Sequence, residues 1–148
     1  MENLKSLLKR ESGTRGVARS VHGEVVRFTH RGVADLYRLV VDRPDFTPDA
    51  TLADNVIGKG AALLAVYGGF AEVYGELMSR PAFATLTAAG ITASCGTLVD
   101  NIINRAGTDI CPIEKLVADV SDPACALTLI HDKLSQMNYP SSIHSEQL

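Results

Sequence analysis

The densest group of reactive side chains in this sequence lies in residues 104–115, NRAGTDICPIEK. The segment brings together an amide, a guanidinium, a thiol and two carboxylates, separated by residues typical of turns. These groups could form an active site, clamp a ligand, or serve only to begin a helix. Each of these three roles assigns a different function to the individual side chains.

The second half of this segment has the pattern of a helix start. Pro112 suits the first position of a helix and makes Cys111 the N-cap. Glu114 then stands at the third helical position, from which its carboxylate can reach back to the amide of Cys111, as in a capping box. With Asp109 closing a turn at Gly107, this interpretation makes Cys111 a small buried residue with no reaction to perform.

The same pattern also suits a ligand. Amides at the N-terminus of a helix favour anions and lower the pKa of a thiol placed there, which makes Cys111 a candidate catalytic nucleophile. Asn104 and Arg105 add an amide and a fork of donors suited to phosphate or carboxylate, and a helix cap needs neither. We therefore predict ligand contacts from Asn104, Arg105, Asp109 and Glu114, and both interpretations of Cys111 stay open.

Lys59 is the second candidate, because it is one of two strongly polar residues between Asn55 and Gly69. A helix that is apolar around nearly its whole circumference is buried on more than one side. We expect such a helix here, with Asp54 as its N-cap and as a partner and fellow ligand contact for Lys59. A lone lysine usually extends to solvent. This helix offers almost no polar face for that, so Lys59 is predicted to enter a pocket as a ligand-binding or catalytic group.

The elements that must position these residues alternate between helix and strand. Apolar spacing and turn residues predict, in order, a helix at 2–11, a hairpin at 16–30, a helix that ends at Pro44, the helix at 55–69, a strand at 70–78, a helix from Ser79 to Gly90, a strand at 91–99, the helix at Pro112 and a last helix at 121–136. This order predicts a three-layer α/β/α fold with a mixed, mainly parallel sheet. In such sheets ligands bind beyond the carboxyl ends of strands, where helices begin. We expect one domain over residues 1–137 and a flexible tail at 138–148.

Composition argues against several classes of protein. A net charge of −3 and a pI near 5.7 argue against general nucleic-acid binding. The run from Gly60 to Phe70 is too short to span a bilayer, and the charged N-terminus is not a secretory signal. Three cysteines without a C-x-x-C pair fit a reducing compartment, and the histidines share no ligand spacing. We therefore expect a cytoplasmic protein with no membrane contact, no metal and no cofactor.

Two segments, ADNVIGKGAALL and INRAGTDICPIEK, together with AGI between them, resemble an uncharacterised bacterial family, domain of unknown function 1893. The resemblance runs from about residue 17 to about residue 130. It implies a cytidine-deaminase-like α/β/α fold and brings no established activity. Zinc deaminases need H-x-E or C-x-E at one helix start and P-C-x-x-C at the next. In this sequence Pro81 is followed by Ala82 and Thr85 where the thiolates should stand, so the resemblance implies the fold without zinc-dependent deamination.

Three functions remain as predictions. The favoured one is binding of a nucleotide-like or other anionic small molecule in a cleft between two helix N-termini, with Lys59 on one wall and Asn104 and Arg105 on the other. The second is a thiol-dependent enzyme or redox sensor that uses Cys111. The third is a non-catalytic assembly module in which residues 55–69 lie partly at a subunit contact, and a homo-oligomer is expected in any case.

Overall fold

The computed structural model describes residues 1–10, 12–30 and 32–137 of the chain. The tail predicted at residues 138–148 lies outside the described residues. The helices and strands are, in order, α1 (Glu2–Arg10), β1 (Gly16–Arg19), β2 (Val25–Phe28), α2 (Ala34–Asp42), β3 (Thr51–Ile57), α3 (Lys59–Gly68), β4 (Glu72–Ser79), α4 (Arg80–Ala88), β5 (Thr92–Val99), α5 (Pro112–Val117) and α6 (Pro123–Gln136).

The strands form one mixed sheet in the order β2-β1-β3-β4-β5. The hairpin predicted near the start of the chain is confirmed as β1 and β2, which pair antiparallel. β1 also pairs antiparallel with β3, whereas β3, β4 and β5 run parallel to one another. Parallel neighbours need a crossover connection, and α3 and α4 supply the two that this sheet requires.

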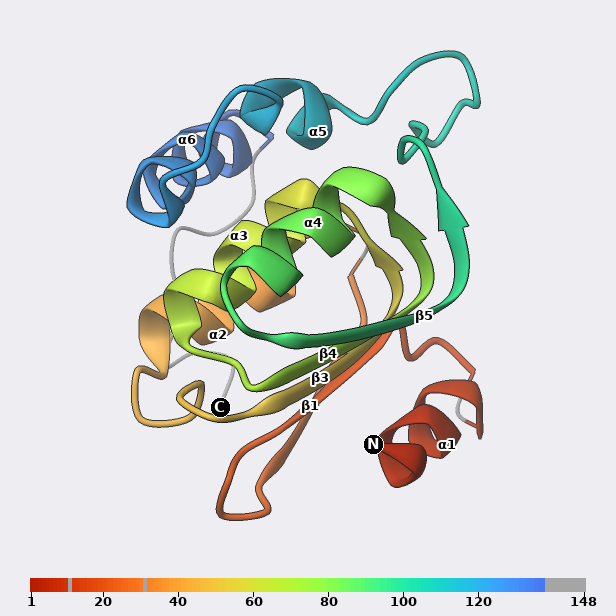
Figure 1. Ribbon diagram of the computed structural model, residues 1–148, viewed down its shortest axis with the longest axis vertical. Coiled ribbons are helices and arrows are strands. Elements are labelled where there is room, and N and C mark those ends of the chain that lie inside the picture. The colour runs from red at the N-terminus through yellow and green to blue at the C-terminus, as the bar shows by residue number, and fades with distance from the viewer. Residues whose placement is uncertain (11, 31, 138–148) are drawn as a thin grey trace.

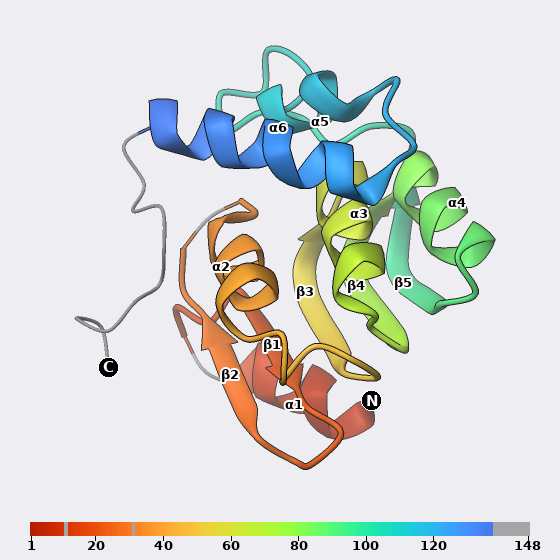
Figure 2. The same ribbon diagram turned by 90° about the vertical axis from the view of Figure 1, so that its left-hand side faces the viewer.

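Helices cover both faces of the sheet, which confirms the predicted α/β class (Figure 1). α2, α3 and α4 lie on one face, and α6 packs across α2 and α3, as Figure 2 shows from the side. α1 lies on the other face, against β1 and β3. The arrangement is consistent with the predicted three-layer α/β/α fold.

Two groups of buried apolar side chains join these layers. The larger lies between the sheet and the helices on its α3 side, and includes Leu64, Val73 and Ile130. The smaller lies under α1 and includes Leu4 and Leu8. α3 contacts α2, α4, α5 and α6, so it is the central helix of the fold. Its buried apolar residues pack within the chain, and the subunit contact suggested for residues 55–69 stays a prediction.

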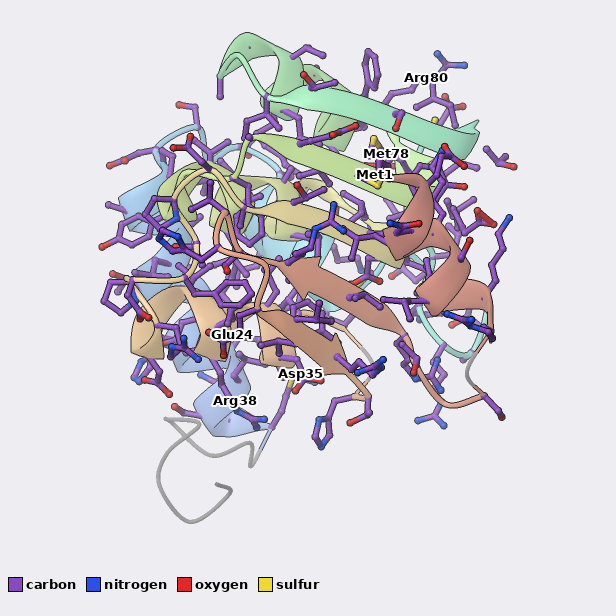
Figure 3. The ribbon with its side chains drawn as sticks, turned by 90° about the horizontal axis from the view of Figure 1, so that it is seen from below. Met1, Glu24, Asp35, Arg38, Met78 and Arg80 are labelled. Atoms are coloured by element: carbon purple, nitrogen blue, oxygen red, sulfur yellow. The ribbon has the colours of Figure 1, made fainter. Side chains whose placement is uncertain are left out.

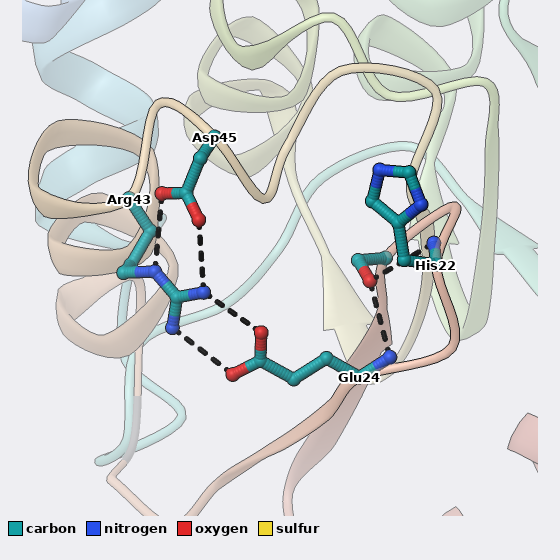
Figure 4. Close-up of polar contacts among 5 residues, drawn as sticks. His22, Glu24, Arg43 and Asp45 are labelled. Carbon is teal, nitrogen blue, oxygen red and sulfur yellow. Dashed lines mark hydrogen bonds and ion pairs between the residues drawn. The ribbon is translucent and has the colours of Figure 1, made fainter.

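An ion-pair cluster joins the hairpin to the end of α2 (Figure 4). Arg43 donates to both carboxylate oxygens of Glu24, at 2.8 and 3.1 Å, and to both of Asp45, at 3.0 and 3.2 Å. The Arg43 guanidinium holds the pKa of both carboxyl groups below the ordinary range. In the turn itself, the Ser20 hydroxyl accepts the amides of His22 and Glu24.

The boundary between β3 and α3 differs from the prediction. Residues 55–57 belong to β3, and α3 begins at Lys59 with Gly58 as its N-cap. β3 is a central strand that pairs with β1 on one side and β4 on the other, and its ladder with β4 continues to the end of the strand. These hydrogen bonds hold the backbone extended past the predicted helix start. Asp54 is therefore a strand residue, and its predicted role as a helix N-cap is wrong.

The parallel strands share one interruption in their pairing. It falls at Asn55 and Glu76 between β3 and β4, and at Glu76 and Gly96 between β4 and β5. Leu52 and Ile57 lie in the same core cluster although an odd number of positions separates them. Because side chains along a strand alternate between faces, this change of phase indicates that the strands are locally distorted at the interruption, although their register is the same on both sides of it. α3 and α4 begin from the strand ends beyond it.

Candidate functional site

The N-terminus of α3 holds the carboxylate of Glu114, which comes from α5. The Lys59 amide donates to Glu114 Oε1 at 2.6 Å, and the Gly60 amide donates to Oε2 at 3.1 Å. Amides in the first turn of a helix have no partner within it, and they make this end of a helix attractive to anions. A carboxylate of the same chain therefore fills the anion position predicted at this helix start.

Two glycines make room for this contact. A β-carbon on Gly58 would lie 2.5 Å from the Glu114 carboxylate, and one on Gly60 would lie 2.5 Å from Ile113 Cγ2. Gly58 has a φ of −100°, which any residue adopts, so the close approach of Glu114 is what requires glycine there. The GKG and PIE segments, far apart in the sequence, are thus two sides of one interface.

The Lys59 side chain holds the other end of α5. Its Nζ donates to the carbonyl oxygen of Ala118, the C-cap residue of α5, at 2.9 Å. The backbone amide and the ammonium group of one residue therefore bind the two ends of the same short helix. An ammonium group has three donors, so two remain for solvent or for a ligand.

Cys111 is the N-cap of α5 with Pro112 at the first helical position, as predicted. Its side chain makes no capping hydrogen bond, and the thiol is partly buried against the larger core cluster. The capping box predicted for Glu114 is wrong, because its carboxylate binds the amides of α3 instead of the Cys111 amide. Reaction at the Cys111 thiol stays a prediction.

Asn104 organises the loop between β5 and α5. Its side-chain oxygen accepts the amides of Thr108 and Asp109 at 3.0 and 3.4 Å, and its side-chain nitrogen donates to Thr108 Oγ1 at 3.1 Å. Its backbone amide donates to the Asp109 carbonyl at 2.7 Å. Gly107 turns the chain with a φ of 75°, a left-handed conformation that favours glycine. A ligand that contacts the Asn104 side chain must therefore compete with bonds inside the loop.

The two charged residues of this loop have different surroundings. Asp109 pairs with Lys115 of α5, which holds the pKa of Asp109 below its ordinary range, and it also accepts the Ile110 amide at 2.7 Å. Arg105 is exposed and has no hydrogen-bond or ion-pair partner among the described residues. Ligand contacts from Asn104, Arg105 and Asp109 stay predictions, and Arg105 is the one whose donors are not used within the loop.

Asp54 faces β1 rather than the start of α3. A β-carbon on Gly16 would lie 2.5 Å from Asp54 Oδ2, and Asp54 Oδ1 accepts the Val56 amide at 3.1 Å. Burial raises the pKa of the Asp54 carboxyl to about 7, the charge of Asp35 adds to this shift, and Arg15 opposes it. Asp54 is therefore a group that titrates in the neutral range, and Lys59, its predicted partner, binds α5 instead.

A groove of about 430 Å³ lies between α3, α4 and the start of α6. Figure 2 shows how the three helices meet, with α6 across the layer that contains α3 and α4. The walls of the groove are mainly apolar and include Leu63 and Val66 of α3, Ala84 and Ala88 of α4, and Pro123 of α6.

Lys59 is the only charged residue among the described residues that line this groove, and Thr85 and Ser121 add hydroxyl groups. Lys59 lines this groove, and its predicted role as a ligand-binding or catalytic group stays a prediction. The α4 wall was missed. Its signal in the sequence is the pair Ala84 and Ala88, which stand four positions apart and so leave one face of the helix without large side chains.

A smaller depression of about 170 Å³ lies between β2 and α2 and includes His30, Asp35 and Arg38. Figure 3 shows Asp35 and Arg38 near each other on this side of the molecule. The Asp35 carboxylate accepts the amides of Thr29 and His30 at 2.9 and 3.0 Å, and lies 2.9 Å from His30 Nδ1 and 3.3 Å from an Arg38 guanidinium nitrogen. The three contacts with Thr29 and His30 join the end of β2 to α2, and the Arg38 contact lies within α2, so we interpret this cluster as structural.

Within residues 1–10, 12–30 and 32–137, no three His, Cys, Asp or Glu side chains converge on a possible metal position. None of the helices in the same ranges is long and apolar enough to cross a membrane. Cys95, Cys111 and Cys125 are free thiols.

Comparison with known proteins assigns a family. The family model described as "Domain of unknown function (DUF1893)" matches residues 4–134. A DUF1893 family protein of Thermotoga maritima has a similar crystal structure, with a TM-score of 0.77 and 23% sequence identity over 90% of this chain and 91% of that chain. At this identity the similarity shows the fold alone, and no curated protein matches the sequence. The chain belongs to the DUF1893 family.

Proposed function

We propose that this protein binds an anionic small molecule with an apolar body, in the groove between α3, α4 and α6. One observation carries the proposal: a groove with mainly apolar walls has a single charged lining residue among those described, and that residue is Lys59. Small-molecule sites are typically apolar clefts of about 300–1,000 Å³ with a few polar groups that fix the orientation of the ligand. The volume of about 430 Å³ and the lining of this groove agree with that description.

The position of Glu114 moves the proposed anion site away from the helix amides. Its carboxylate already accepts the amides of Lys59 and Gly60, so an added anion would have to expel a charged group of the same chain. The Lys59 ammonium keeps donors that Ala118 does not use, and the side chain lines the groove. An anionic group on the ligand would therefore bind Nζ, while the apolar body would lie along α4.

We also infer that the fold is cytidine-deaminase-like and that the ligand is nucleotide-like. The start of α3 and the start of α4 follow the adjacent parallel strands β3 and β4, which supports the first inference. A flat ring would fit between the aliphatic walls, and Thr85 and Ser121 offer hydroxyl groups to a sugar, which supports the second.

Fluorescence titration with 1-anilinonaphthalene-8-sulfonate tests the proposal, because this probe combines a flat apolar body with one anionic group. We expect saturable binding to the native protein. Lys59→Met should weaken it at least about tenfold, since it removes a charge-assisted contact. The neutral probe N-phenyl-1-naphthylamine should bind the wild type and Lys59→Met alike.

A pair of tryptophan variants on α4 locates the probe. Ala88→Trp fills the groove and should abolish binding of both probes. Thr87→Trp, the matched control, adds the same side chain at the neighbouring position, which does not line the groove, and should have no effect. The proposal fails if the native protein shows no saturable binding, or if Ala88→Trp binds the anionic probe as the wild type does.

A further inference from the structure

The longest stretch of sequence without a charged residue runs from Pro81 to Val99, and it exceeds the Gly60–Phe70 run noted above. It forms nearly all of α4 and the whole of β5. Arg80 and Asp100 stand at its two ends and form an ion pair with each other at 2.9 Å. One flank of the molecule therefore carries an uncharged strand, β5, beside a helix, α4, whose only charged residue is Arg80 at its start.

The strand of this pair is an edge of the sheet. β5 pairs with β4 on one side, and no described strand lies on its other side (Figure 1). Half of the peptide groups of an edge strand point away from the sheet and can pair with another strand. Monomeric proteins usually protect such edges with lysine, proline or a very short strand. β2, the opposite edge, has four residues including Arg27, whereas β5 has eight residues and neither charge nor proline.

The helix beside this edge adds an apolar side chain to the same flank. Ala82 and Leu86 of α4 are buried against the core, and Ala84 and Ala88 line the groove. Helical spacing of about 100° per residue then directs Phe83 away from the groove, to the side of α4 that faces the β5 edge. Phe83 is 37% exposed, so an apolar ring is accessible on this flank.

We propose that a second copy of this chain binds here, with the two β5 strands antiparallel across a two-fold axis. Identical strands that pair antiparallel give an interface that is complementary to itself and closed. Full overlap of the strands sets Ser94 opposite the partner's Thr97, and no like charges meet because β5 has none.

The interruption at Gly96 fits this arrangement. It divides β5 into two segments, Thr92–Cys95 and Thr97–Val99, and an axis beside it lets each segment pair with the opposite segment of the other copy. The two α4 flanks then lie on the same side of the joined sheet, and Phe83 of each copy adds apolar area to an interface that strand pairing alone leaves small.

Light scattering coupled to size-exclusion chromatography tests the proposal. At micromolar concentration we expect a mass near twice 15.8 kDa. Thr97→Lys, at an exposed position of β5, should raise the dimer dissociation constant at least about tenfold, because a lysine on the edge opposes strand pairing. Val21→Lys, at the exposed hairpin turn, is the matched control and should leave the mass unchanged.

Two further measurements keep the outcome decisive. Phe83→Lys on α4 should weaken the dimer without altering β5, which covers the case in which Thr97→Lys fails to fold. Hydrogen exchange of the β5 amides should slow as protein concentration rises in the wild type, and should not change in Thr97→Lys. A mass of 15.8 kDa at every concentration would overturn the proposal, as would a dimer that withstands both folded variants.

Discussion

At the scale of single residues, Asp54 and Lys59 do not form the pair that the sequence suggested. Asp54 lies on β3 against Gly16, where burial raises the pKa of its carboxyl, and Lys59 binds α5 through both its amide and its ammonium group. Neither residue is held in position by the other. Each is held by a segment distant in sequence, β1 for Asp54 and α5 for Lys59.

Asp54 makes the stability of the protein depend on pH in a defined direction. Its folded-state pKa of about 7 exceeds the ordinary 3.8, so folding disfavours the charged form. The stability contributed by the protonated carboxyl is full below about pH 4 and is lost as the pH rises through 7. Asp54→Asn, which keeps an oxygen for the Val56 amide, should therefore gain stability relative to the wild type by up to about 3 kcal/mol between about pH 5 and about pH 8.

Urea denaturation at the two pH values measures this difference in the free energy of unfolding. Asp119→Asn, at an exposed position, controls for the loss of one negative charge. If the difference in the free energy of unfolding between Asp54→Asn and the wild type is the same at both pH values, folding does not raise the pKa of the Asp54 carboxyl.

At the scale of elements, α5 is a short helix that depends on α3 for its position. Its six residues offer little helical stability of their own, because an isolated helix of this length is marginal in water. Glu114, Ile113 and the carbonyl of Ala118 attach it to the first turn of α3. Gly58 and Gly60 allow this attachment, since a β-carbon at either position would occupy the space of α5.

A double-mutant cycle tests this attachment. Glu114→Ala should cost about 1–3 kcal/mol of the free energy of unfolding, because it exposes two first-turn amides and removes a charged acceptor. Gly58→Ala should also cost about 1–3 kcal/mol, because its β-carbon meets the carboxylate. In the Glu114→Ala background the Gly58→Ala cost should largely vanish, so the two effects should fall short of additivity by at least about 1 kcal/mol.

Gly68→Ala, at the other end of α3, provides the control for this cycle. Its β-carbon would approach Thr47 rather than α5, so its effect should add to that of Glu114→Ala. Additive behaviour of Gly58→Ala as well would show that Glu114 does not occupy the space in front of Gly58 in solution.

At the scale of the whole molecule, α4 separates the two proposed binding surfaces. Ala84 and Ala88 face the groove with Lys59, whereas Phe83 faces the open edge of the sheet at β5. A ligand and a second copy of the chain would therefore approach α4 from opposite sides. The homo-oligomer expected from the sequence would use this edge.

The separation predicts that the two functions are independent. Thr97→Lys should weaken the dimer and leave the affinity for 1-anilinonaphthalene-8-sulfonate within about twofold of the wild type, because strand and groove share no residue. Ala88→Trp should abolish probe binding and leave the dimer intact. Fluorescence titration and light scattering on these two variants measure probe binding and dimer formation. Loss of both in either variant would contradict the independence of the two surfaces.

Local chemistry in the sequence determined most of the elements. The hairpin turns at His22 and Gly23, Ser79 caps α4, and Asp122 caps α6, as short-range patterns predict. Each of these signals acts within a few residues, because a cap or a turn satisfies backbone groups next to it. The same signals were enough to predict a mixed sheet with helices on both faces.

Only the tertiary structure decided where β3 ends and what occupies the start of α3. The residues before Gly58 suit either a helix or a strand, and pairing with β4, which continues to Ile57, selects the strand. Glu114 satisfies a capping box in its own helix by sequence, yet it binds amides 54 and 55 positions away, because the fold brings a second helix start within reach. A pattern within one segment cannot distinguish between two such partners, since both offer free amides to the same carboxylate.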